Sequence, residues 1–252
     1  MYTQRPYRYR LDWGRRGVLQ AVEQGSMLVI VDTLRFSTAT ITATHYGGLI
    51  YPCSLDEDAA SLARSIGGEM AVSRQDVPNK GRFSLSPATY FNLEAGTKVV
   101  LASPNGATCS RYGGQVPYLF IGALVNARAV AEVISSLVEQ EDLAVTIIAC
   151  GERWKIPSED GVLRFAIEDY LGAGAILSYL QGEKSPEARA CEGAFVQIRN
   201  DLEGILWDCG SGRELREKGF EADVKHAAQL NIYQVVPYMR DGYLEPYTSS
   251  SS

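Results

Sequence analysis

The strongest constraint on the fold is an unbroken apolar run, Met27–Val31, which lies between Ser26 and Asp32. Five consecutive apolar residues with polar neighbours are typical of a strand that is buried on both faces, as in the middle of a parallel sheet. The run ends at a carboxylate, and in sheets of this kind ligands bind beyond the carboxyl ends of the strands. We therefore expect the chemistry of the chain to begin at Asp32.

Short apolar runs alternate with helical stretches along the rest of the chain. The clearest helix is Ala59–Ile66, where Ser54 and Glu57 form a capping box and two glycines follow the last turn. Such repeated βα units predict an α/β fold, with a largely parallel or mixed sheet and helices on both faces. The predicted strands are residues 27–31, 49–52, 69–72, 98–102, 118–121, 144–149 and 232–236.

The length of 252 residues allows one α/β domain, which we place over residues 26–247, with two subdomains as an alternative. Residues 1–25 are expected to form an N-terminal arm or edge segment, and residues 248–252 a disordered tail. Tyrosines and arginines mix over residues 5–16, a composition that could contact RNA or an acidic surface. A solvated arm or edge strand is the competing interpretation.

Composition narrows the class of partner. The formal net charge is −6, which disfavours a broad nucleic-acid surface but leaves room for one local anion pocket. The sequence shows no secretory signal and no apolar run long enough to span a bilayer, so we expect a cytoplasmic protein with no membrane partner. Its five cysteines include no C-x-x-C pair and are read as reduced thiols. A homodimer is compatible with the sequence.

An anion site is predicted directly after the first apolar run. Ser37 or Thr38 can cap a helix, whose free N–H groups and dipole would then point toward Asp32. Arg35 can hold a phosphate or carboxylate with its planar fork, and Asp32 suits a hard cation such as Mg²⁺. The alternative is that Asp32 is a loop cap and Arg35 a surface ion-pair partner.

Other strand ends supply polar groups that should gather at the same rim. Asn105-Gly106 permits a tight turn with exposed amides, although an ordinary turn before a helix would look the same. Ser86-Pro87 is a helix-start signal, and Asn126 precedes another predicted helix. The candidate substrate-binding residues are Arg35, Ser37, Thr38, Ser86, Ser103, Asn105, Gly106 and Asn126.

Two further carboxylates, Glu168 and Asp169, stand at the start of a helix rich in small residues. Together with Asp32 they could complete a Mg²⁺ site, since this ion takes a few carboxylates and keeps several waters. Acidic residues in a first helical turn also complement the helix dipole without any metal. The candidate catalytic residues are Asp32, Arg35 and Glu168.

Several phosphatase mechanisms are excluded because the residues they need are missing. The position two residues after Asp32 is Leu34 rather than a second aspartate, and no cysteine has an arginine six positions later. The two histidines lack an Arg-His-Gly context and are too few for a binuclear metal centre. No phosphate-binding loop for nucleotides is present. What remains is metal-assisted attack of water on a phosphomonoester, with an aspartyl nucleophile as the open alternative.

The ordered set of motifs resembles the Mg²⁺-dependent 2-phosphosulfolactate phosphatases of coenzyme M biosynthesis. The matching segments are Val31 to Thr38, Ser86-Pro87, Ser103 to Gly106, Gly122 to Ala127, Cys150-Gly151, Ile167 to Asp169, Ala173 to Ala175 and Asp223-Val224. The resemblance implies a cytoplasmic α/β hydrolase that uses Mg²⁺ and converts (2R)-2-phospho-3-sulfolactate to 3-sulfolactate and phosphate. It further implies active-site roles for Asp32, Arg35, Ser103, Asn105, Glu168 and Asp169.

The chain departs from the family pattern at three places. Leu85 replaces the asparagine usual before Ser-Pro, Ser103-Pro104 replaces two threonines, and the segment between Cys150 and Glu168 is longer than usual. Two alternatives therefore stay open: a phosphatase for a different small phosphomonoester, and a non-catalytic anion-binding protein of the same fold.

Overall fold

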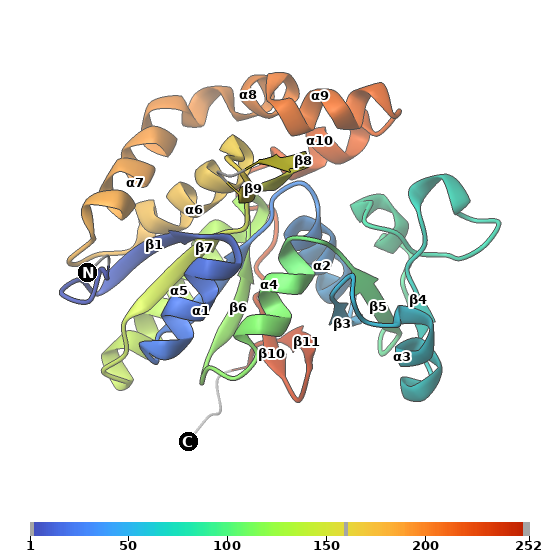
Figure 1. Cartoon of the computed structure of the whole chain (residues 1–252), viewed down its shortest axis with the longest axis horizontal. Coiled ribbons are helices and arrows are strands. Elements are labelled where there is room, and N and C mark those ends of the chain that lie inside the picture. Colours follow the sequence, from blue (N-terminus) through green and yellow to red (C-terminus); the bar gives the residue numbers. More distant parts are fainter. Residues whose placement is uncertain (1–2, 159–160, 249–252) are drawn as a thin grey trace.

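A mixed β-sheet forms the centre of the molecule (Figure 1). The computed structural model describes residues 3–158 and 161–248, and within these residues the sheet has nine strands in the order β1-β7-β2-β6-β10-β11-β3-β5-β4. Residues 249–252 of the predicted tail lie outside the described residues. The strands are β1 (Tyr9–Trp13), β2 (Met27–Val31), β3 (Leu49–Cys53), β4 (Glu69–Met70), β5 (Lys98–Ala102), β6 (Leu119–Gly122), β7 (Val145–Ala149), β10 (Pro237–Arg240) and β11 (Tyr243–Pro246).

The sheet consists of two parallel parts that are joined by a hairpin. β1, β7, β2 and β6 run parallel to their neighbours, as do β3, β5 and β4. The hairpin β10–β11 lies between these parts and pairs antiparallel with β6 on one side and with β3 on the other. The prediction of a largely parallel or mixed sheet is therefore confirmed.

Helices cover both faces of the sheet. Leu28 and Ile30 of β2 belong to the apolar core shared with α1, α2 and α4, whereas Met27, Val29 and Val31 belong to the core shared with α5 and α6. All five side chains are fully buried, which explains why the apolar run has no polar interruption. The helices of these layers are α1 (Gly14–Glu23), α2 (Phe36–His45), α4 (Gly106–Gly113), α5 (Ala127–Gln140) and α6 (Ile167–Tyr179), and α3 (Ala59–Ile66) packs beside β4 and β5.

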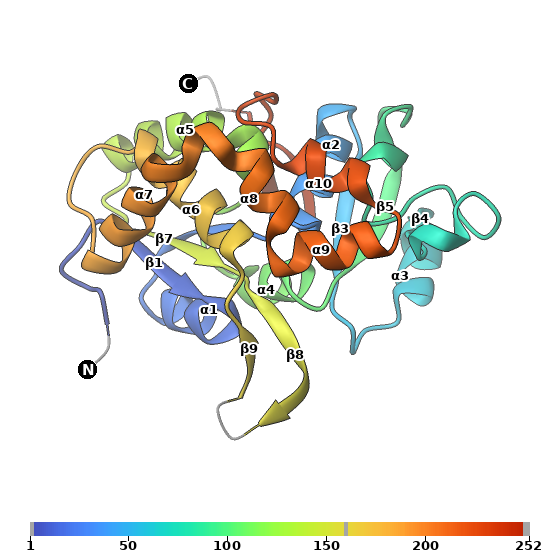
Figure 2. The same cartoon turned by 90° about the horizontal axis from the view of Figure 1, so that it is seen from above.

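Four further helices arch across one side of the molecule (Figures 1 and 2). They are α7 (Pro186–Ile198), α8 (Leu202–Asp208), α9 (Gly210–Glu217) and α10 (Glu221–Ala227). α10 reaches the end of β2 through an ion pair between Asp223 and Arg35. Within residues 3–158 and 161–248, the helices are all too short or too polar to cross a lipid bilayer.

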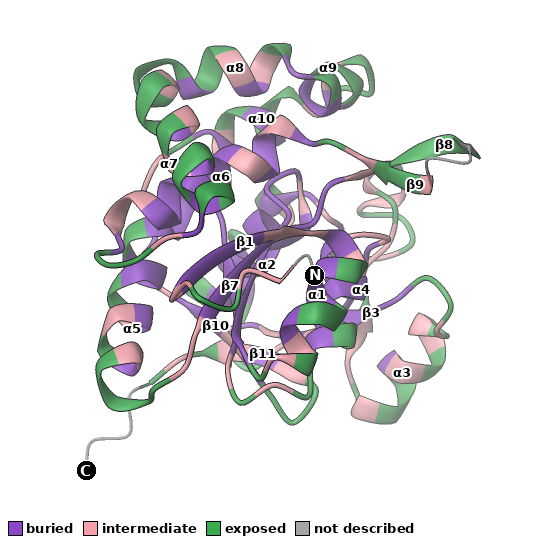
Figure 3. Cartoon of the chain, turned by 60° about the vertical axis from the view of Figure 1, so that its left-hand side comes forward, coloured by how far each residue is buried: buried purple, intermediate pink, exposed green. Residues whose placement is uncertain are grey.

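A two-stranded ribbon follows β7 and extends away from the sheet (Figure 2). It consists of β8 (Glu152–Ser158) and β9 (Gly161–Arg164), which pair antiparallel. Much of the ribbon is solvent-exposed (Figure 3), and Ile156 has 87% of its surface accessible. The ribbon lies between Cys150 and Glu168, the stretch expected from the resemblance to be longer than in the family, and its strands were not predicted.

Most predicted sheet strands are confirmed. β2, β5 and α3 have the predicted bounds, and β3, β4, β6 and β7 overlap their predicted ranges. The strand predicted over residues 232–236 is wrong, because this segment bonds to the turn after β6 instead of a strand. Asn231 and Tyr233 donate their N–H groups to the carbonyls of Leu124 and Val125, and β10 begins only at Pro237.

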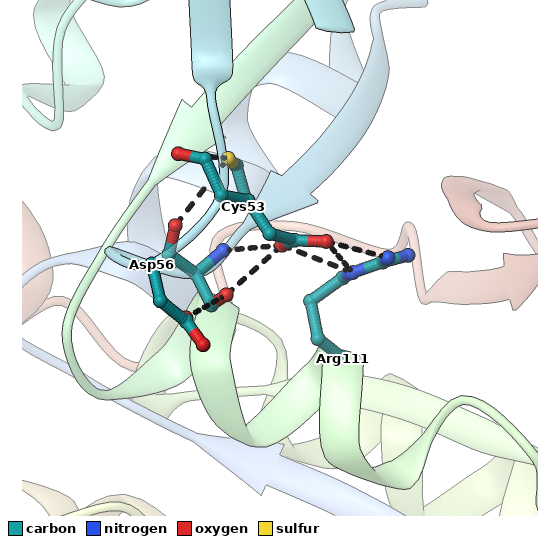
Figure 4. Close-up of polar contacts among 5 residues, drawn as sticks. Cys53, Asp56 and Arg111 are labelled. Atoms are coloured by element: carbon teal, nitrogen blue, oxygen red, sulfur yellow. Dashed lines mark hydrogen bonds and ion pairs between the residues drawn. The ribbon is translucent and has the colours of Figure 1, made fainter.

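Two helix-start signals work differently from the prediction. Glu57 accepts the Ser54 N–H at 2.8 Å and is clamped by Arg111 (Figure 4), but Asp58 is the residue that caps α3, through the Ser61 N–H. The Ser54–Glu57 pair therefore shapes the turn before the helix. Ser86-Pro87 starts only a 3₁₀ turn, Pro87–Tyr90, rather than an α-helix.

The small residues of α6 allow close packing against α7. A Cβ atom on Gly174 would lie 2.5 Å from the Cys191 carbonyl oxygen, so Gly174→Ala should lower the free energy of unfolding by about 1–3 kcal/mol. Gly193→Ala on α7 is the matched control, because no atom lies within 4 Å of its added Cβ, and it should raise stability by about 0.5–1 kcal/mol. Urea denaturation of both variants measures this difference, and equal effects would contradict the close approach.

Candidate active site

Asp32 is a buried carboxylate directly after β2, and it accepts hydrogen bonds from turns of both parallel parts of the sheet. Its Oδ2 accepts the Gly106 N–H at 2.7 Å and the Ser103 hydroxyl at 3.4 Å, both from the turn after β5. Its Oδ1 accepts the Phe36 N–H at 3.3 Å, from the first turn of α2. The carboxylate is therefore held by backbone amides from two strand-to-helix turns.

The turn after β5 needs glycine at position 106. A Cβ atom there would lie 2.7 Å from Asp32 Oδ2, so a side chain would push the carboxylate away from its amide donor. Gly106 is also the first residue of α4, so its N–H is one of those that a helix leaves free. The predicted Asn105-Gly106 turn thus exposes an amide, and Asp32 receives it.

Ser37 and Thr38 shape the loop after β2 from inside α2 rather than by capping it. The helix begins at Phe36, and its capping position, Arg35, makes no side-chain capping bond. Ser37 Oγ accepts the Asp32 N–H at 2.9 Å, and Thr38 Oγ1 donates to the Thr33 carbonyl at 2.8 Å. The predicted helix is confirmed, but the prediction that Ser37 or Thr38 caps it is wrong.

Asp169 joins two strand-end loops. Its Oδ1 accepts the Thr33 N–H at 2.7 Å, and its Oδ2 accepts the Gly151 N–H at 2.9 Å. These amides follow β2 and β7, which are neighbours in the sheet. Both oxygens of this buried carboxylate therefore serve to fix the rim of the site.

Arg35 is held by a carboxylate of its own. Its Nη1 donates to Asp223 Oδ2 at 2.8 Å, and its guanidinium lies 4.9 Å from the centre of the Phe220 ring. The second oxygen, Asp223 Oδ1, accepts the Ser86 hydroxyl at 2.5 Å. This chain of contacts connects α10 and the turn after residue 85 to the guanidinium.

Four carboxylates lie close enough to interact electrostatically: Asp32, Glu152, Glu168 and Asp169. Burial and, to a smaller extent, the charge of Glu168 raise the pKa of Asp32 to about 6, although the hydrogen bonds from the Gly106 and Phe36 amides lower it. Burial also raises the pKa of Glu152 to about 7, helped by the charges of Asp32 and Glu168. The pKa of Asp169 lies well above its ordinary value, chiefly through burial. Such a cluster favours a cation or shared protons.

A cavity of about 270 Å³ opens in front of Asp32. α9 and Lys218 directly after it form one wall, and the turns after β2 and β5 form the others together with Leu85 and Glu152. Glu152 faces the cavity and accepts a hydrogen bond from Asn105 Nδ2 at 3.1 Å. The lining residues are Asp32, Leu34, Arg35, Phe36, Leu85, Ser103, Pro104, Asn105, Glu152, Ser211, Glu214, Leu215 and Lys218.

A family model and several similar known proteins point to the same family. The family model described as 2-phosphosulpholactate phosphatase matches residues 17–242. The chain belongs to this family. A relative from Carboxydothermus hydrogenoformans, named "Probable 2-phosphosulfolactate phosphatase", is 31% identical over 86% of this chain and 87% of its own length.

Two relatives carry the name 2-phosphosulfolactate phosphatase without that qualifier. The one from Methanothermobacter thermautotrophicus is 29% identical over 88% of this chain and 91% of its own length. The one from Methanocaldococcus jannaschii is 27% identical over 84% of this chain and 88% of its own length. The family resemblance stated from the sequence motifs is therefore confirmed.

In this member of the 2-phosphosulpholactate phosphatase family, the cavity brings together only part of the predicted residue set. Asp32, Arg35, Ser103 and Asn105 line it, and Gly106 donates to Asp32. The remaining predicted residues are buried and are not among those that line the cavity: Ser37, Thr38, Ser86, Asn126, Glu168 and Asp169.

The side chain of Asn126 makes hydrogen bonds to the backbone of the fold. Its Oδ1 accepts the Ala123 N–H at 3.0 Å, and its Nδ2 donates to the carbonyls of Ile121 and Val235. The side chain therefore holds the turn after β6 to the segment before β10. The Ser86 hydroxyl likewise donates its hydrogen bond to Asp223.

Sequence reasoning missed Glu152, Asp223 and the wall formed by α9. Glu152 follows a predicted strand end, and Asp223 stands in a motif shared with the family, so each had a signal that was not converted into a role. The α9 residues Ser211, Glu214 and Lys218 had none, because their place over the cavity depends on how distant helices pack.

The donor set at the site suits a hard cation. Among residues 3–158 and 161–248, no group of three or more His, Cys, Asp or Glu side chains is arranged to hold a metal ion. Mg²⁺ needs only one or two protein carboxylates when waters and a substrate phosphate complete its shell. Asp32 lines the cavity and fits this requirement, whereas Asp169 is not among the residues that line it.

The raised pKa values predict how stability depends on pH in metal-free protein. The pKa of Asp32 rises from 3.8 unfolded to about 6 folded, so the folded state binds more protons and stability falls between about pH 4 and 7. Asp32→Asn removes this loss. The free energy of unfolding of the variant minus that of the native protein should therefore increase by on the order of 3 kcal/mol from about pH 4 to about pH 7.

Chemical denaturation with EDTA at several pH values measures the effect. Glu132→Gln, an exposed carboxylate on α5, is the control and should run parallel to the native protein. Parallel curves for Asp32→Asn and the native protein would contradict a buried, proton-binding Asp32.

Proposed function

We propose that the protein is a Mg²⁺-dependent phosphatase that hydrolyses 2-phosphosulfolactate to 3-sulfolactate and phosphate. The observation that carries the proposal is Asp32: a buried strand-end carboxylate that faces a cavity with Arg35 and is held by the Gly106 amide. Family membership and the printed names of the relatives support the substrate. The reaction consumes water, breaks the phosphate ester and leaves a hydroxyl on the organic product.

In this proposal Asp32 is the main protein ligand of Mg²⁺, and Glu168 is a second carboxylate close to it. Bound Mg²⁺ would neutralise phosphate charge and make the phosphorus more electrophilic. Arg35 would hold a phosphate oxygen, and its bond to Asp223 fixes the direction of its fork. Asp169 is a positioning residue, because it acts through the amides of Thr33 and Gly151.

Glu152 is the proposed proton carrier. It lines the same cavity as Asp32, and burial raises its pKa to about 7 in the metal-free protein, where a carboxyl group can both accept and return a proton near neutral pH. Its bond from Asn105 orients the carboxylate. We propose that it takes the proton of the attacking water.

A second candidate function follows from the cavity wall. Leu85 and Pro104, both departures from the family pattern, line the cavity and reduce its hydrogen-bonding capacity. This favours either another small phosphorylated acid as substrate or a non-catalytic anion-binding protein. We further propose a cytoplasmic protein with a small-molecule partner and without a nucleic-acid partner, which the net charge of −6 supports.

Phosphate release from 2-phosphosulfolactate tests the main proposal. The native protein with Mg²⁺ should release phosphate, and EDTA should abolish the release until Mg²⁺ is restored. Asp32→Asn should lower kcat by about a hundredfold or more, because one charged ligand is lost. Binding of phosphate as seen by thermal stabilisation, without any turnover, would instead support the anion-binding protein.

Glu152→Gln tests the proton carrier. Loss of a general base should lower kcat by about 10²–10⁴-fold and change KM little. Glu214→Gln is the matched control, since Glu214 lines the same cavity but is paired with Lys218, and it should change kcat by no more than about twofold. Equal losses in the two variants would remove Glu152 from the proposed mechanism.

A further inference from the structure

A second cavity adjoins the candidate active site. It measures about 480 Å³ and lies between α1, the start of α4 and the β8–β9 ribbon. It shares Pro104 and Asn105 with the cavity in front of Asp32, so one small molecule can contact both. Its lining residues are Trp13, Gly14, Arg15, Arg16, Pro104, Asn105, Cys109, Cys150, Arg153, Gly161, Val162 and Leu163.

The two cavities differ in the balance of charged residues that line them. The cavity at Asp32 is lined by three carboxylates and two cations, and each cation has a carboxylate partner: Arg35 with Asp223, and Lys218 with Glu214. The adjoining cavity is lined by Arg15, Arg16 and Arg153 and, in the described part of the chain, by no carboxylate. An anion therefore gains most at the adjoining cavity.

Within residues 3–158 and 161–248, the three guanidiniums take part in none of the ion pairs. Arg15 donates to the Pro104 carbonyl at 3.4 Å, which places it on the wall common to both cavities. Arg16 and Arg153 are exposed and stand on different elements, α1 and β8.

Another wall of this cavity is apolar and is held in place by aromatic packing. Trp13 packs against Phe165 at 5.1 Å and Tyr170 at 5.9 Å between ring centres, so its indole is fixed. Leu163 and Val162 of β9 extend the apolar surface. Such a surface suits the carbon chain of a small acid whose charged end reaches the arginines.

We infer that this cavity is the subsite for the second strong-acid group of the substrate, which in 2-phosphosulfolactate is the sulfonate. The inference rests on the proposed function for the identity of that group. A sulfonate stays ionised at any physiological pH and offers three oxygens, which match the fixed donors of a guanidinium. Arg15, Arg16 and Arg153 are then specificity-determining residues, and Asp32 and Glu152 act at the phosphate.

Calorimetric binding of 3-sulfolactate tests the subsite without catalysis. The native protein should bind it, and Arg16→Gln and Arg153→Gln should each weaken binding by about tenfold, the loss expected for one charged hydrogen bond. Both side chains are exposed, so the variants should fold, and circular dichroism checks this. Arg64→Gln, an exposed arginine on α3 outside this cavity, is the matched control and should bind like the native protein. Absence of binding, or equal affinity in all variants, would overturn the subsite.

Kinetics separate this inference from the proposed function. With 2-phosphosulfolactate the two arginine variants should raise KM by about tenfold at nearly unchanged kcat, whereas with 2-phospholactate, which lacks the sulfonate, their KM should equal that of the native protein. A native protein that hydrolyses 2-phosphosulfolactate while the variants keep its KM would overturn the subsite alone. A native protein that binds 3-sulfolactate through these arginines without any turnover would overturn the phosphatase alone.

Discussion

The structure depends on the burial of one carboxylate, Asp32, between two turns that come from different parts of the sheet. Burying a charge is costly unless hydrogen bonds replace its lost hydration. Here the amides of Gly106 and Phe36 supply them, and the pKa of about 6 records that they compensate for burial only in part. The Mg²⁺ proposed at this site would offset the remaining cost.

The other carboxylates around Asp32 have different positions and hydrogen-bond partners. Asp169 fixes the loops after β2 and β7, and Asp223 fixes Arg35 and Ser86. Neither lines the cavity formed within the described residues, whereas Glu152 does. The acidic character of the site therefore has two origins: carboxylates that position backbone or guanidinium groups, and carboxylates that line the cavity.

The sequence predicted the parts of the fold that follow from local pattern. β2 and β5 were predictable because a strand buried on both faces is a continuous apolar run, and α3 because it ends in glycine. The β8–β9 ribbon was not, since an exposed ribbon with Ile156 in solvent has no half-buried alternation. β10 and β11 form a hairpin around Asp241-Gly242, a local turn signal that the prediction did not use, whereas their pairing with β6 and β3 depends on the three-dimensional arrangement.

The site was predictable where a strand end carries its own residue, as at Asp32 and Asn105. It was not predictable where a side chain makes its hydrogen bonds to the backbone of the fold instead. Asn126 resembles a ligand-binding residue in the sequence, yet its amide bridges two backbone segments. Glu152 lay next to a predicted strand end, but its raised pKa depends on burial and on the charges of Asp32 and Glu168, which no local pattern reveals.

A crystal structure of the protein with Mg²⁺ and inorganic phosphate tests the central claim most directly. The account predicts an ion about 2.1 Å from an oxygen of Asp32, with most of its other ligands being waters and a phosphate oxygen. The phosphate should lie in the cavity lined by Arg35 and Glu152. An ion bound away from Asp32, or a phosphate that occupies another surface while this cavity holds only water, would contradict it.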